Sequence, residues 1–367
     1  MDRRTADRLL RARAQAIAGG VRETTVAAAL DRVLAVQAQD LTAAALGLRV
    51  RVAGLTAEDV RRATDVERTA IRGWFMRGTL QLVAAGDARW LLALLGPVHL
   101  ALGVRRLREL GLDERLCERA DRLLLRAVDG EGPLTRAELT ERLGSLGVES
   151  KGQAAFHLIR RAALSGLICH GPQRAGEATF VPLDSWLPAT GPLPFTGDAA
   201  VAELARRYRR AHGPSDAADL AHWSGLRTTV CRKAWAAAGE PRWEEVPAEA
   251  PQGDVRLLPA YDNYLLAHRR RELSVPAEHE RRVWPGGGVI RATVLVDGLA
   301  VATWSGGRRG TQPVVEPFPG GALDDSADAE RIGEGVERES ADLARFYNDS
   351  HTHSTTGLRP RGFVTGP

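Results

Sequence analysis

Cysteine, lysine and long apolar runs are scarce in this sequence. The 367 residues include only three cysteines, Cys117, Cys169 and Cys231, far apart and never in a C-x-x-C pair. That spacing argues against a disulfide framework or a zinc site, and no other cluster has metal-ligand spacing, so we expect no metal and no cofactor. Charges interrupt the first 20 residues, and no run of about 18 apolar residues follows. We therefore expect a cytoplasmic protein without a membrane span.

Nearly all of the cationic side chains are arginine. Of 50 lysine and arginine residues only Lys151 and Lys233 are lysine, and the net charge is +4. The planar guanidinium suits phosphate, which favours a nucleic-acid partner. A GC-rich genome and ordinary solvated faces also raise the arginine content, so composition alone leaves both interpretations open.

The middle of the chain predicts two helices followed by a hairpin. Thr135 and Glu138 have the spacing of a capping box, which predicts a helix to about Leu143. A glycine-containing turn with Lys151 precedes a second amphipathic run, and two short apolar strands follow it. The strands flank "GPQRAGEA", whose glycines and proline mark a hairpin tip carrying Arg174. Helix, turn, helix and hairpin are the order of a winged helix.

The same order recurs on both sides of this unit. "SDAADLAHWSGLRTTVCRKAWAAAG" predicts a capped helix, a tight turn and a second helix, with "RWEEVP" as a strand. Upstream, "TTVAAALDRVLA" and "TAEDVRRAT" predict helices, and "TAIRGWFMRGTLQLV" predicts a hairpin with Arg77 at its bend. Three such units suit a monomeric clamp on DNA, with protein–protein scaffolding as the alternative. The expected α+β fold has winged-helix units in 1–115, 116–192 and 193–250, a β-rich region with a closing helix in 251–347 and a tail in 348–367.

The region after Pro251 has the composition of strands. Asp297 and Gly298 stand between alternating apolar residues in "GVIRATVLVDGLAVATW", which predicts a two-residue hairpin. The following "SGGRRG" carries Arg308 and Arg309, and its glycines let a backbone approach phosphate closely. An exposed loop without a ligand fits the same residues equally well.

Two glutamines occur one residue apart in "VQAQD", directly behind an apolar helix. On a helix, Gln37 and Gln39 point in nearly opposite directions, whereas in an extended segment they share a face. If both amides serve one site, this segment is therefore extended. Asp40 follows them and is either a catalytic base or the N-cap of the next helix.

These motifs together resemble the AlkZ family of bacterial DNA glycosylases. The resemblance rests on "VQAQD" behind a helix, "IRGWFMRGTLQLVAAGDARWLLALL", the central winged-helix unit and "LLPAYDNYLLAHRRR", in that order, and covers most of the chain. The family's Gln-x-Gln signature falls on Gln37 and Gln39. Its Gln-x-Asp branch is not matched, because the acid lies one residue later at Asp40. The family fold that the resemblance implies is a C-shaped set of tandem winged helices around a concave basic cleft.

The implied activity is hydrolysis of the N-glycosidic bond of N7-alkylguanine, including the unhooking of azinomycin-type interstrand crosslinks in self-resistance and DNA repair. A guanine alkylated at N7 is already cationic, so its departure needs no general acid. The amide oxygens of Gln37 and Gln39 then have only to orient a water molecule and stabilise positive charge on the sugar.

Two classes of function remain on the sequence alone. The first is a monofunctional glycosylase that uses water, because Lys151 and Lys233 are the only amine candidates for a Schiff base. The second is a non-enzymatic winged-helix regulator. Either would bind double-stranded DNA, and the glycosylase would bind DNA bearing alkylated or crosslinked guanine. The predicted DNA-contacting residues are Arg77, Lys151, Arg174, Arg308 and Arg309.

Overall fold

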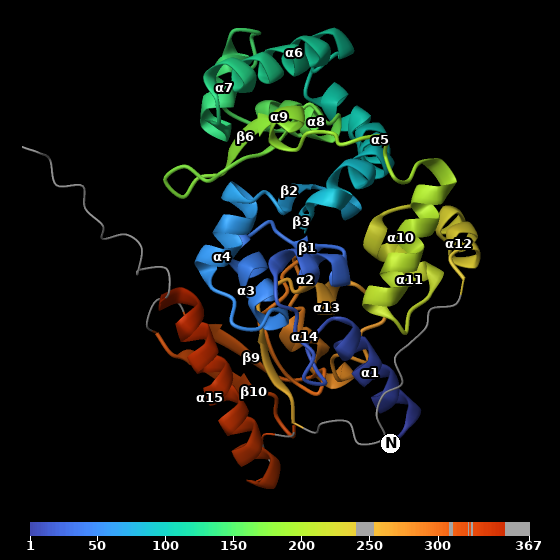
Figure 1. The fold of residues 1–367 in the computed structure, drawn as a ribbon, viewed down its shortest axis with the longest axis vertical. Helices are drawn as coiled ribbons and strands as arrows, with labels where there is room; N and C mark the ends of the chain where they lie inside the picture. The colour runs from blue at the N-terminus through green and yellow to red at the C-terminus, as the bar shows by residue number, and fades with distance from the viewer. Residues whose placement is uncertain (240–252, 308–310, 322, 324–325, 349–367) are drawn as a thin grey trace, which may run out of the picture.

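Helices and small antiparallel sheets alternate along this chain (Figure 1). The computed structural model describes residues 1–239, 253–307, 311–321, 323 and 326–348. Within these residues the strands form three sheets, with the orders β1-β3-β2, β4-β6-β5 and β10-β9-β8-β7. The mixed α and β content predicted from the sequence is confirmed.

The N-terminal segment puts the glutamine motif at a sheet edge. The predicted hairpin is present, since β2 and β3 pair antiparallel and Arg77 lies at the bend between them. Strand β1 then pairs with β3, with Gln37 opposite Gln81. The elements are α1 (Arg3–Ala14), α2 (Val26–Val33), β1 (Val36–Gln37), α3 (Leu41–Arg51), α4 (Ala57–Arg61), the π-helical turn η1 (Arg62–Val66), β2 (Ala70–Trp74), the 3-10 turn η2 (Met76–Gly78), β3 (Leu80–Ala84) and α5 (Ala85–Glu109).

The next segment contains the predicted order of two helices and a hairpin. Thr135 and Glu138 form the capping box expected at the start of α7, and β5 pairs antiparallel with β6. Figure 1 shows this segment at one end of the molecule. The elements are α6 (Glu114–Glu131), β4 (Leu134–Thr135), α7 (Arg136–Gly144), α8 (Ala154–Leu164), β5 (Ile168–His170), β6 (Thr179–Pro182) and α9 (Leu183–Trp186).

Three further helices follow, two of which the sequence predicted. Asp216 and Asp219 cap α11 reciprocally, and Gly225 ends it in the left-handed conformation that glycine adopts without strain. The predicted strand "RWEEVP" lies outside the described residues. The elements are α10 (Gly197–His212), α11 (Ala217–Ser224) and α12 (Thr228–Ala237).

The C-terminal segment is a four-stranded sheet closed by a long helix. The hairpin predicted at Asp297 and Gly298 joins β8 to β9, and both residues have positive φ. Arg308, Arg309 and the tail from residue 349 lie outside the described part of the chain. The elements are β7 (Val255–Leu258), α13 (Asn263–Leu266), the 3-10 turn η3 (Ala277–His279), α14 (Glu280–Val283), β8 (Thr293–Val296), β9 (Leu299–Gly306), β10 (Pro313–Pro317) and α15 (Ser326–Asn348).

Helix α5 is the one described helix whose length and composition suit a membrane span, with a mean hydropathy of 1.3 over its most apolar window. It nevertheless packs against β2, α8 and α10. Trp90, Leu91 and Leu95 are buried there. Burial in the core accounts for part of the apolar character of α5, since 33% of its most apolar window is buried inside the protein.

Hydrophobic cores join segments that are far apart in the sequence. One core combines α2, α3 and β3 with β7, β8, β9 and α15. Another combines β2, β3 and α5 with α10, α11 and α12. The sheet that carries the glutamine motif thus lies between these two cores.

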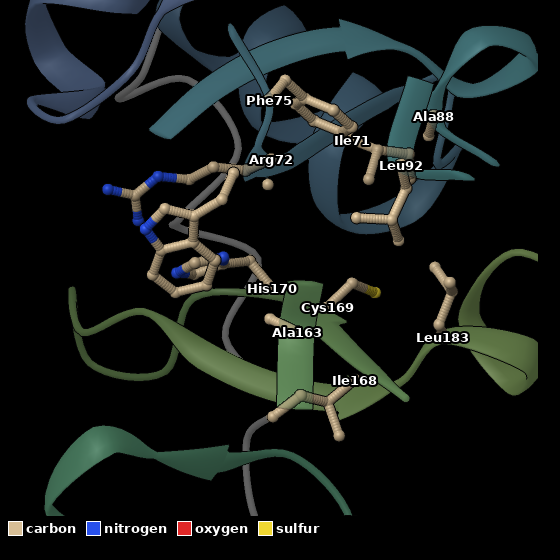
Figure 2. Close-up of a pocket in the computed structure, with 12 residues that line it drawn as sticks. Ile71, Arg72, Phe75, Ala88, Leu92, Ala163, Ile168, Cys169, His170 and Leu183 are labelled. Carbon is tan, nitrogen blue, oxygen red and sulfur yellow. The ribbon is translucent and has the colours of Figure 1, made fainter. Parts of the chain in front are cut away.

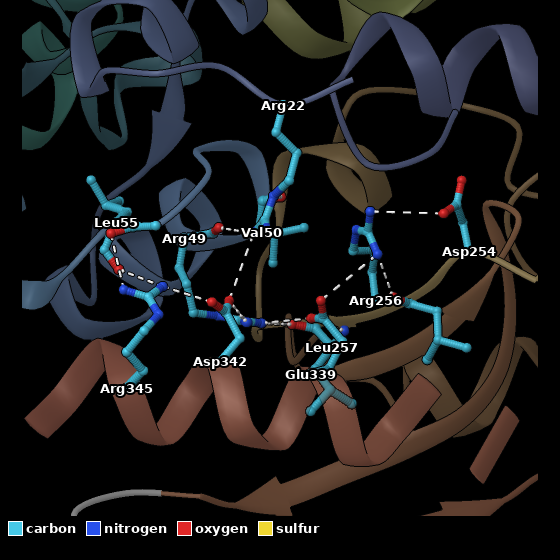
Figure 3. Close-up of polar contacts among 12 residues, drawn as sticks. Arg22, Arg49, Val50, Leu55, Asp254, Arg256, Leu257, Glu339, Asp342 and Arg345 are labelled. Atoms are coloured by element: carbon cyan, nitrogen blue, oxygen red, sulfur yellow. Dashed lines mark hydrogen bonds and ion pairs between the residues drawn. The ribbon is translucent and has the colours of Figure 1, made fainter. Parts of the chain in front are cut away.

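Ion pairs reinforce the contact between α3 and the C-terminal segment (Figure 3). Arg49 donates to Glu339 at 2.9 Å and to Asp342 at 2.6 Å, both on α15. Arg51 makes two hydrogen bonds of 2.7 and 2.8 Å to Asp262, and both side chains are fully buried.

Arg51 also belongs to a buried polar network around His212. It donates to Gln15 Oε1 at 2.9 Å, and the Gln15 amide nitrogen lies 2.6 Å from His212 Nδ1. A second histidine, His268, lies 2.7 Å from the His212 carbonyl oxygen through its Nε2. Both imidazoles are held neutral, because burial lowers the pKa of His268 to about 3 and that of His212 well below its usual value.

We predict that the protein loses stability as the pH falls below about 6.5. Burial also lowers the pKa of His170 to about 3, beside the aromatic rings of Trp74 and Phe180. Below the ordinary pKa of 6.5 the unfolded chain binds protons that the folded chain excludes. Each such histidine therefore lowers the free energy of unfolding by up to about 1.4 kcal/mol per pH unit, down to the folded pKa.

The measurement is urea unfolding at several pH values between 6.5 and 4.5, with His170→Phe as the comparison. This variant keeps an aromatic ring in place but removes one titrating group. Its stability should depend less steeply on pH than that of the parent, by about 1.4 kcal/mol per pH unit. Equal slopes would contradict the assignment of His170.

Candidate functional site

The two glutamines point to the same side of an extended segment. Gln37 Nε2 donates to Gln39 Oε1 at 2.9 Å. The segment is strand and then bend, because α2 ends at Val33 and α3 begins only at Leu41. Gln37 is buried, whereas Gln39 is exposed at the surface. The sequence analysis expected an extended segment if both amides serve one site, and the segment between α2 and α3 is not helical.

The hairpin turn supports the first glutamine from the neighbouring strand. Thr79 Oγ1 lies 3.3 Å from Gln37 Oε1 and 3.0 Å from the Met76 carbonyl oxygen. Gln81 Oε1 accepts a hydrogen bond from the Met76 backbone nitrogen at 3.2 Å, which fixes the same turn. The Thr79 hydroxyl has one hydrogen, which it donates to one of these two oxygens at a time. When Gln37 is the acceptor, Thr79, the Gln37 amide and the Gln39 amide form one chain of hydrogen bonds that leads outward to solvent.

Asp40 is the N-cap of α3. Its Oδ1 accepts hydrogen bonds from the backbone nitrogens of Thr42 at 2.8 Å and Ala43 at 3.2 Å. Of the two roles that the sequence left open, this geometry provides the cap. The carboxylate nevertheless remains exposed, directly beside Gln39.

Arg72 on β2 holds the backbone of the motif. Its Nε donates to the Ala38 carbonyl oxygen at 3.0 Å, and Nη2 donates to the Gln39 carbonyl oxygen at 3.3 Å. Burial lowers the pKa of Arg72 to about 10, and the charge of Asp40 partly opposes that effect. The guanidinium thus connects the motif to the strand beside it and restricts the extended conformation.

A small, mainly apolar hollow lies beside Arg72. Figure 2 shows Arg72 and His170 on one side of a small hollow, with Ala88, Leu92 and Leu183 on the other. The hollow measures about 20 Å³, which is space for about one water molecule, and its lining is mainly apolar. It is a packing defect between β2 and β5 and not a substrate pocket.

Arg77 occupies the hairpin bend in a left-handed conformation, with φ 55° and ψ 15°. Such a conformation costs a residue with a Cβ atom about 1 to 2 kcal/mol. Burial lowers the pKa of Arg77, and no described carboxylate offsets this effect. The turn packs against Gly225, where an added Cβ would lie 3.1 Å from the Arg77 Cα. Residues with a strained backbone cluster at functional sites. Arg77 is such a residue, and its guanidinium is partly buried without a described carboxylate partner.

Arg160 approaches the same bend from α8. Its Nη2 lies 3.4 Å from the Gly78 carbonyl oxygen, and a Cβ on Gly78 would lie 2.5 Å from this nitrogen. Burial lowers its pKa too, again with no described carboxylate to compensate. The neighbouring Arg161, in contrast, pairs with Asp121 at 3.0 Å and Glu114 at 2.7 Å.

The other predicted cations do not join this cluster. Lys151 is exposed in the turn between α7 and α8. Arg174 lies at the predicted hairpin tip, where it pairs with Glu138 and donates to the Pro133 carbonyl oxygen at 3.2 Å. Arg308 and Arg309 lie outside the described residues.

Sequence reasoning missed Arg72, Thr79 and Arg160. Arg72 is one polar residue in an apolar strand, and Thr79 is an ordinary turn residue. Arg160 stands in the arginine pair of α8, but nothing local distinguishes it from Arg161. Only the positions of the carboxylates in the folded protein show that Arg161 is paired and that Arg160 has no described carboxylate partner.

The described residues offer no group of three histidine, cysteine, aspartate or glutamate side chains that could hold a metal ion. All three cysteines are free and buried. The chemistry available at the glutamine motif is therefore that of amide dipoles, one carboxylate and arginine cations acting on water.

This chain is similar to known proteins both in sequence and in fold. The protein named interstrand DNA cross-link repair glycosylase from Streptomyces sahachiroi is 28% identical over an alignment of 343 residues that covers 86% of this chain and 89% of that protein. The solved structure of Streptomyces sahachiroi DNA glycosylase AlkZ superposes with a TM-score of 0.75 and 26% identity, covering 93% of this chain and 97% of the other. Residues 30–346 match the family model described as DNA glycosylase AlkZ-like. The chain therefore belongs to the DNA glycosylase AlkZ-like family.

Proposed function

We propose that this protein is a monofunctional DNA glycosylase that hydrolyses the N-glycosidic bond of N7-alkylguanine. The observation that carries the proposal is the pair of hydrogen-bonded amides of Gln37 and Gln39 on one face of an extended segment. Family membership supports glycosylase activity. The name of the Streptomyces sahachiroi relative supports action on interstrand crosslinks, and we extend this to azinomycin-type crosslinks and self-resistance.

The amides have the free capacity that this reaction needs. An amide oxygen has two lone pairs. Gln37 Oε1 has the Thr79 hydroxyl as its one described donor, and Gln39 Oε1 has the Gln37 amide. One lone pair on each oxygen is therefore available to a water molecule held below C1′ of the sugar. The same carbonyl dipoles stabilise the positive charge that develops on the sugar as the bond breaks.

The positive charge of the lesion replaces the general acid that the two amides cannot provide. A glutamine cannot protonate a leaving group or accept a full proton, so the bond must already be weak. An N7-alkylated guanine carries a positive charge and leaves as a neutral base, which removes the need for a general acid. We assign Asp40 to the cap of α3 and to the negative field beside the sugar cation.

Arg77 and Arg160 provide an anion site at the hairpin bend that precedes Thr79. Two partly buried guanidinium groups without a described carboxylate are suited to the phosphates that flank a lesion. We further propose that the helix–hairpin units act as winged helices in a C-shaped, monomeric clamp. The segment α6, β4, α7, α8, β5 and β6 supports this proposal, because its elements follow the order of a winged helix.

The first prediction concerns the amides. Replacing Gln37 or Gln39 by Ala removes one acceptor of the water molecule, which costs about 1 to 3 kcal/mol in the transition state, or about tenfold to a hundredfold in rate. Single-turnover release of N7-methylguanine from duplex DNA measures the effect. Gln153→Ala is the matched control, because Gln153 is exposed and its amide oxygen accepts from Arg106, which is not part of the proposed site. A double Gln37/Gln39 variant with the parental rate would remove these residues from the mechanism.

The second prediction concerns the unpaired arginines. Arg160→Ala should reduce the slope of log affinity against log salt by about 0.9, because one phosphate contact is lost. Arg161→Ala should leave the slope unchanged, since its charge is already paired with Asp121 and Glu114. Arg77→Gly should lower the slope like Arg160→Ala and fold normally, because glycine adopts φ 55° without strain.

Fluorescence anisotropy with undamaged duplex DNA at several salt concentrations gives these slopes. Thermal unfolding confirms that each variant is folded. If Arg160→Ala and Arg161→Ala have the same slope, the distinction between a free and a paired arginine fails.

The third prediction tests the activity itself. Purified protein in buffer with a chelator should release N7-methylguanine from duplex DNA and separate the strands of an N7-crosslinked duplex. It should not release uracil or 8-oxoguanine, because their glycosidic bonds stay strong without a general acid. Chromatography detects the free base, and denaturing gels detect unhooked strands. Tight DNA binding with no base release would instead favour a non-enzymatic regulator.

A further inference from the structure

Thr79 follows the hairpin bend and lies against the buried Gln37 amide. Its Oγ1 is 3.3 Å from Gln37 Oε1 and 3.0 Å from the Met76 carbonyl oxygen. Its backbone is extended, with φ of −99° and ψ of 158°. One hydroxyl thus lies between a catalytic candidate and the turn that carries it.

The bend holds the Thr79 side chain in place. Arg77 and Gly78 both have positive φ, of 55° and 64°. The Gly78 backbone nitrogen donates to the Phe75 carbonyl oxygen at 2.9 Å, and the Phe75 nitrogen donates to the Thr79 carbonyl oxygen at 3.1 Å. His99 is buried on α5 and packs against Gly78, where an added Cβ would lie 3.2 Å from its Nδ1. The turn, and not Gln37, therefore sets where the hydroxyl lies.

The acceptor that competes with Gln37 already has a partner. The Met76 carbonyl oxygen accepts a hydrogen bond from the Thr79 backbone nitrogen at 3.2 Å. Gln37 Oε1 belongs to a buried side chain, and the Thr79 hydroxyl is its one described donor. A buried acceptor without a donor is costly, which favours donation of the hydroxyl hydrogen to Gln37.

The direction of this hydrogen bond decides how the two amides face each other. An amide has an oxygen acceptor on one side and an NH2 donor on the other. With Gln37 Oε1 turned to the Thr79 hydroxyl, Gln37 Nε2 faces Gln39 and donates to its Oε1 at 2.9 Å. A hydroxyl that donated to Met76 would offer Gln37 only an acceptor, so the amide could turn over. The dipole that Gln37 presents to a water molecule would then reverse.

We propose that Thr79 is a positioning residue, whose hydroxyl holds the Gln37 amide in the orientation that the reaction needs. The proposal rests on the proposed function, in which the amide oxygens orient water and stabilise the sugar cation. Thr79 needs no contact with the substrate, because it acts through Gln37. The same turn carries Arg77, so one element both supports an amide and bears a proposed DNA contact.

The experiment measures single-turnover release of N7-methylguanine at saturating protein, together with the affinity for the same duplex. Thr79→Val keeps the branched shape, which suits an extended backbone, but removes the hydroxyl. It should lower the rate constant about threefold to tenfold and leave the affinity unchanged, because one hydrogen bond to Gln37 is lost. Thr79→Ser keeps the hydroxyl and should restore most of the rate. Thr140→Val is the matched control, since the Thr140 hydroxyl donates to the Arg136 carbonyl oxygen at 2.7 Å, within α7.

A double variant distinguishes positioning of the amide from support of the turn. In a Gln37→Ala background, Thr79→Val should cause no further loss of rate, since the group that it positions is absent. A loss by the same factor in both backgrounds would show that the hydroxyl acts through Met76 and the turn. That result overturns the proposal, as does Thr79→Ser that is as slow as Thr79→Val, or Thr79→Val with the parental rate.

These outcomes are separate from a failure of the proposed activity. A parent protein that releases no N7-methylguanine contradicts the glycosylase proposal, and the role of Thr79 falls with it. An active parent with any of the three contrary results removes the role of Thr79 and leaves the activity intact.

Discussion

Two arginines at the end of α3 hold the site together. The Arg51 guanidinium and the Asp262 carboxylate are both fully removed from solvent, and Arg49 is almost as deeply buried against Glu339. Charges in such surroundings are tolerated only when each is paired and hydrogen-bonded, because loss of one partner costs about 3 to 5 kcal/mol. These pairs therefore fix α3 relative to the loop after β7 and to α15. Since Asp40, the N-cap of α3, directly follows Gln39, they also fix the glutamine motif relative to the C-terminal segment.

The remaining arginines divide into three roles that their partners define. Arg161 is neutralised by two acids and holds α8 to α6. Arg72 donates hydrogen bonds to two backbone carbonyl oxygens and restricts the conformation of the glutamine motif. Arg77 and Arg160 have no described carboxylate and meet at one bend, and they are the residues we propose as phosphate contacts. A single residue type thus differs in its surroundings, and in the part assigned to it, according to the charges around it.

Local elements were largely predictable because their causes are local. The capping box at Thr135 and Glu138, the left-handed turn at Gly225 and the hairpin at Asp297 and Gly298 depend on residues within a few positions of each other. The extended conformation of the glutamine motif followed only on the condition that both amides serve one site, since only then must they share a face. The roles of Gln37, Gln39 and Arg77 in catalysis and DNA binding remain predictions, as do the domain boundaries.

The sequence by itself predicted several of the helices, the hairpins and the resemblance to the family, and it set the condition under which the two amides share a face. Only the tertiary structure decided that the first 84 residues share a core with residues 253–348 and that Asp40 caps a helix. It alone distinguished Arg160 from Arg161 and brought residues near 40, 260 and 305 together around one cavity. The physical reason is that caps and turns act over a few residues of chain, whereas burial and charge pairing depend on distance in space, which contacts between remote segments determine.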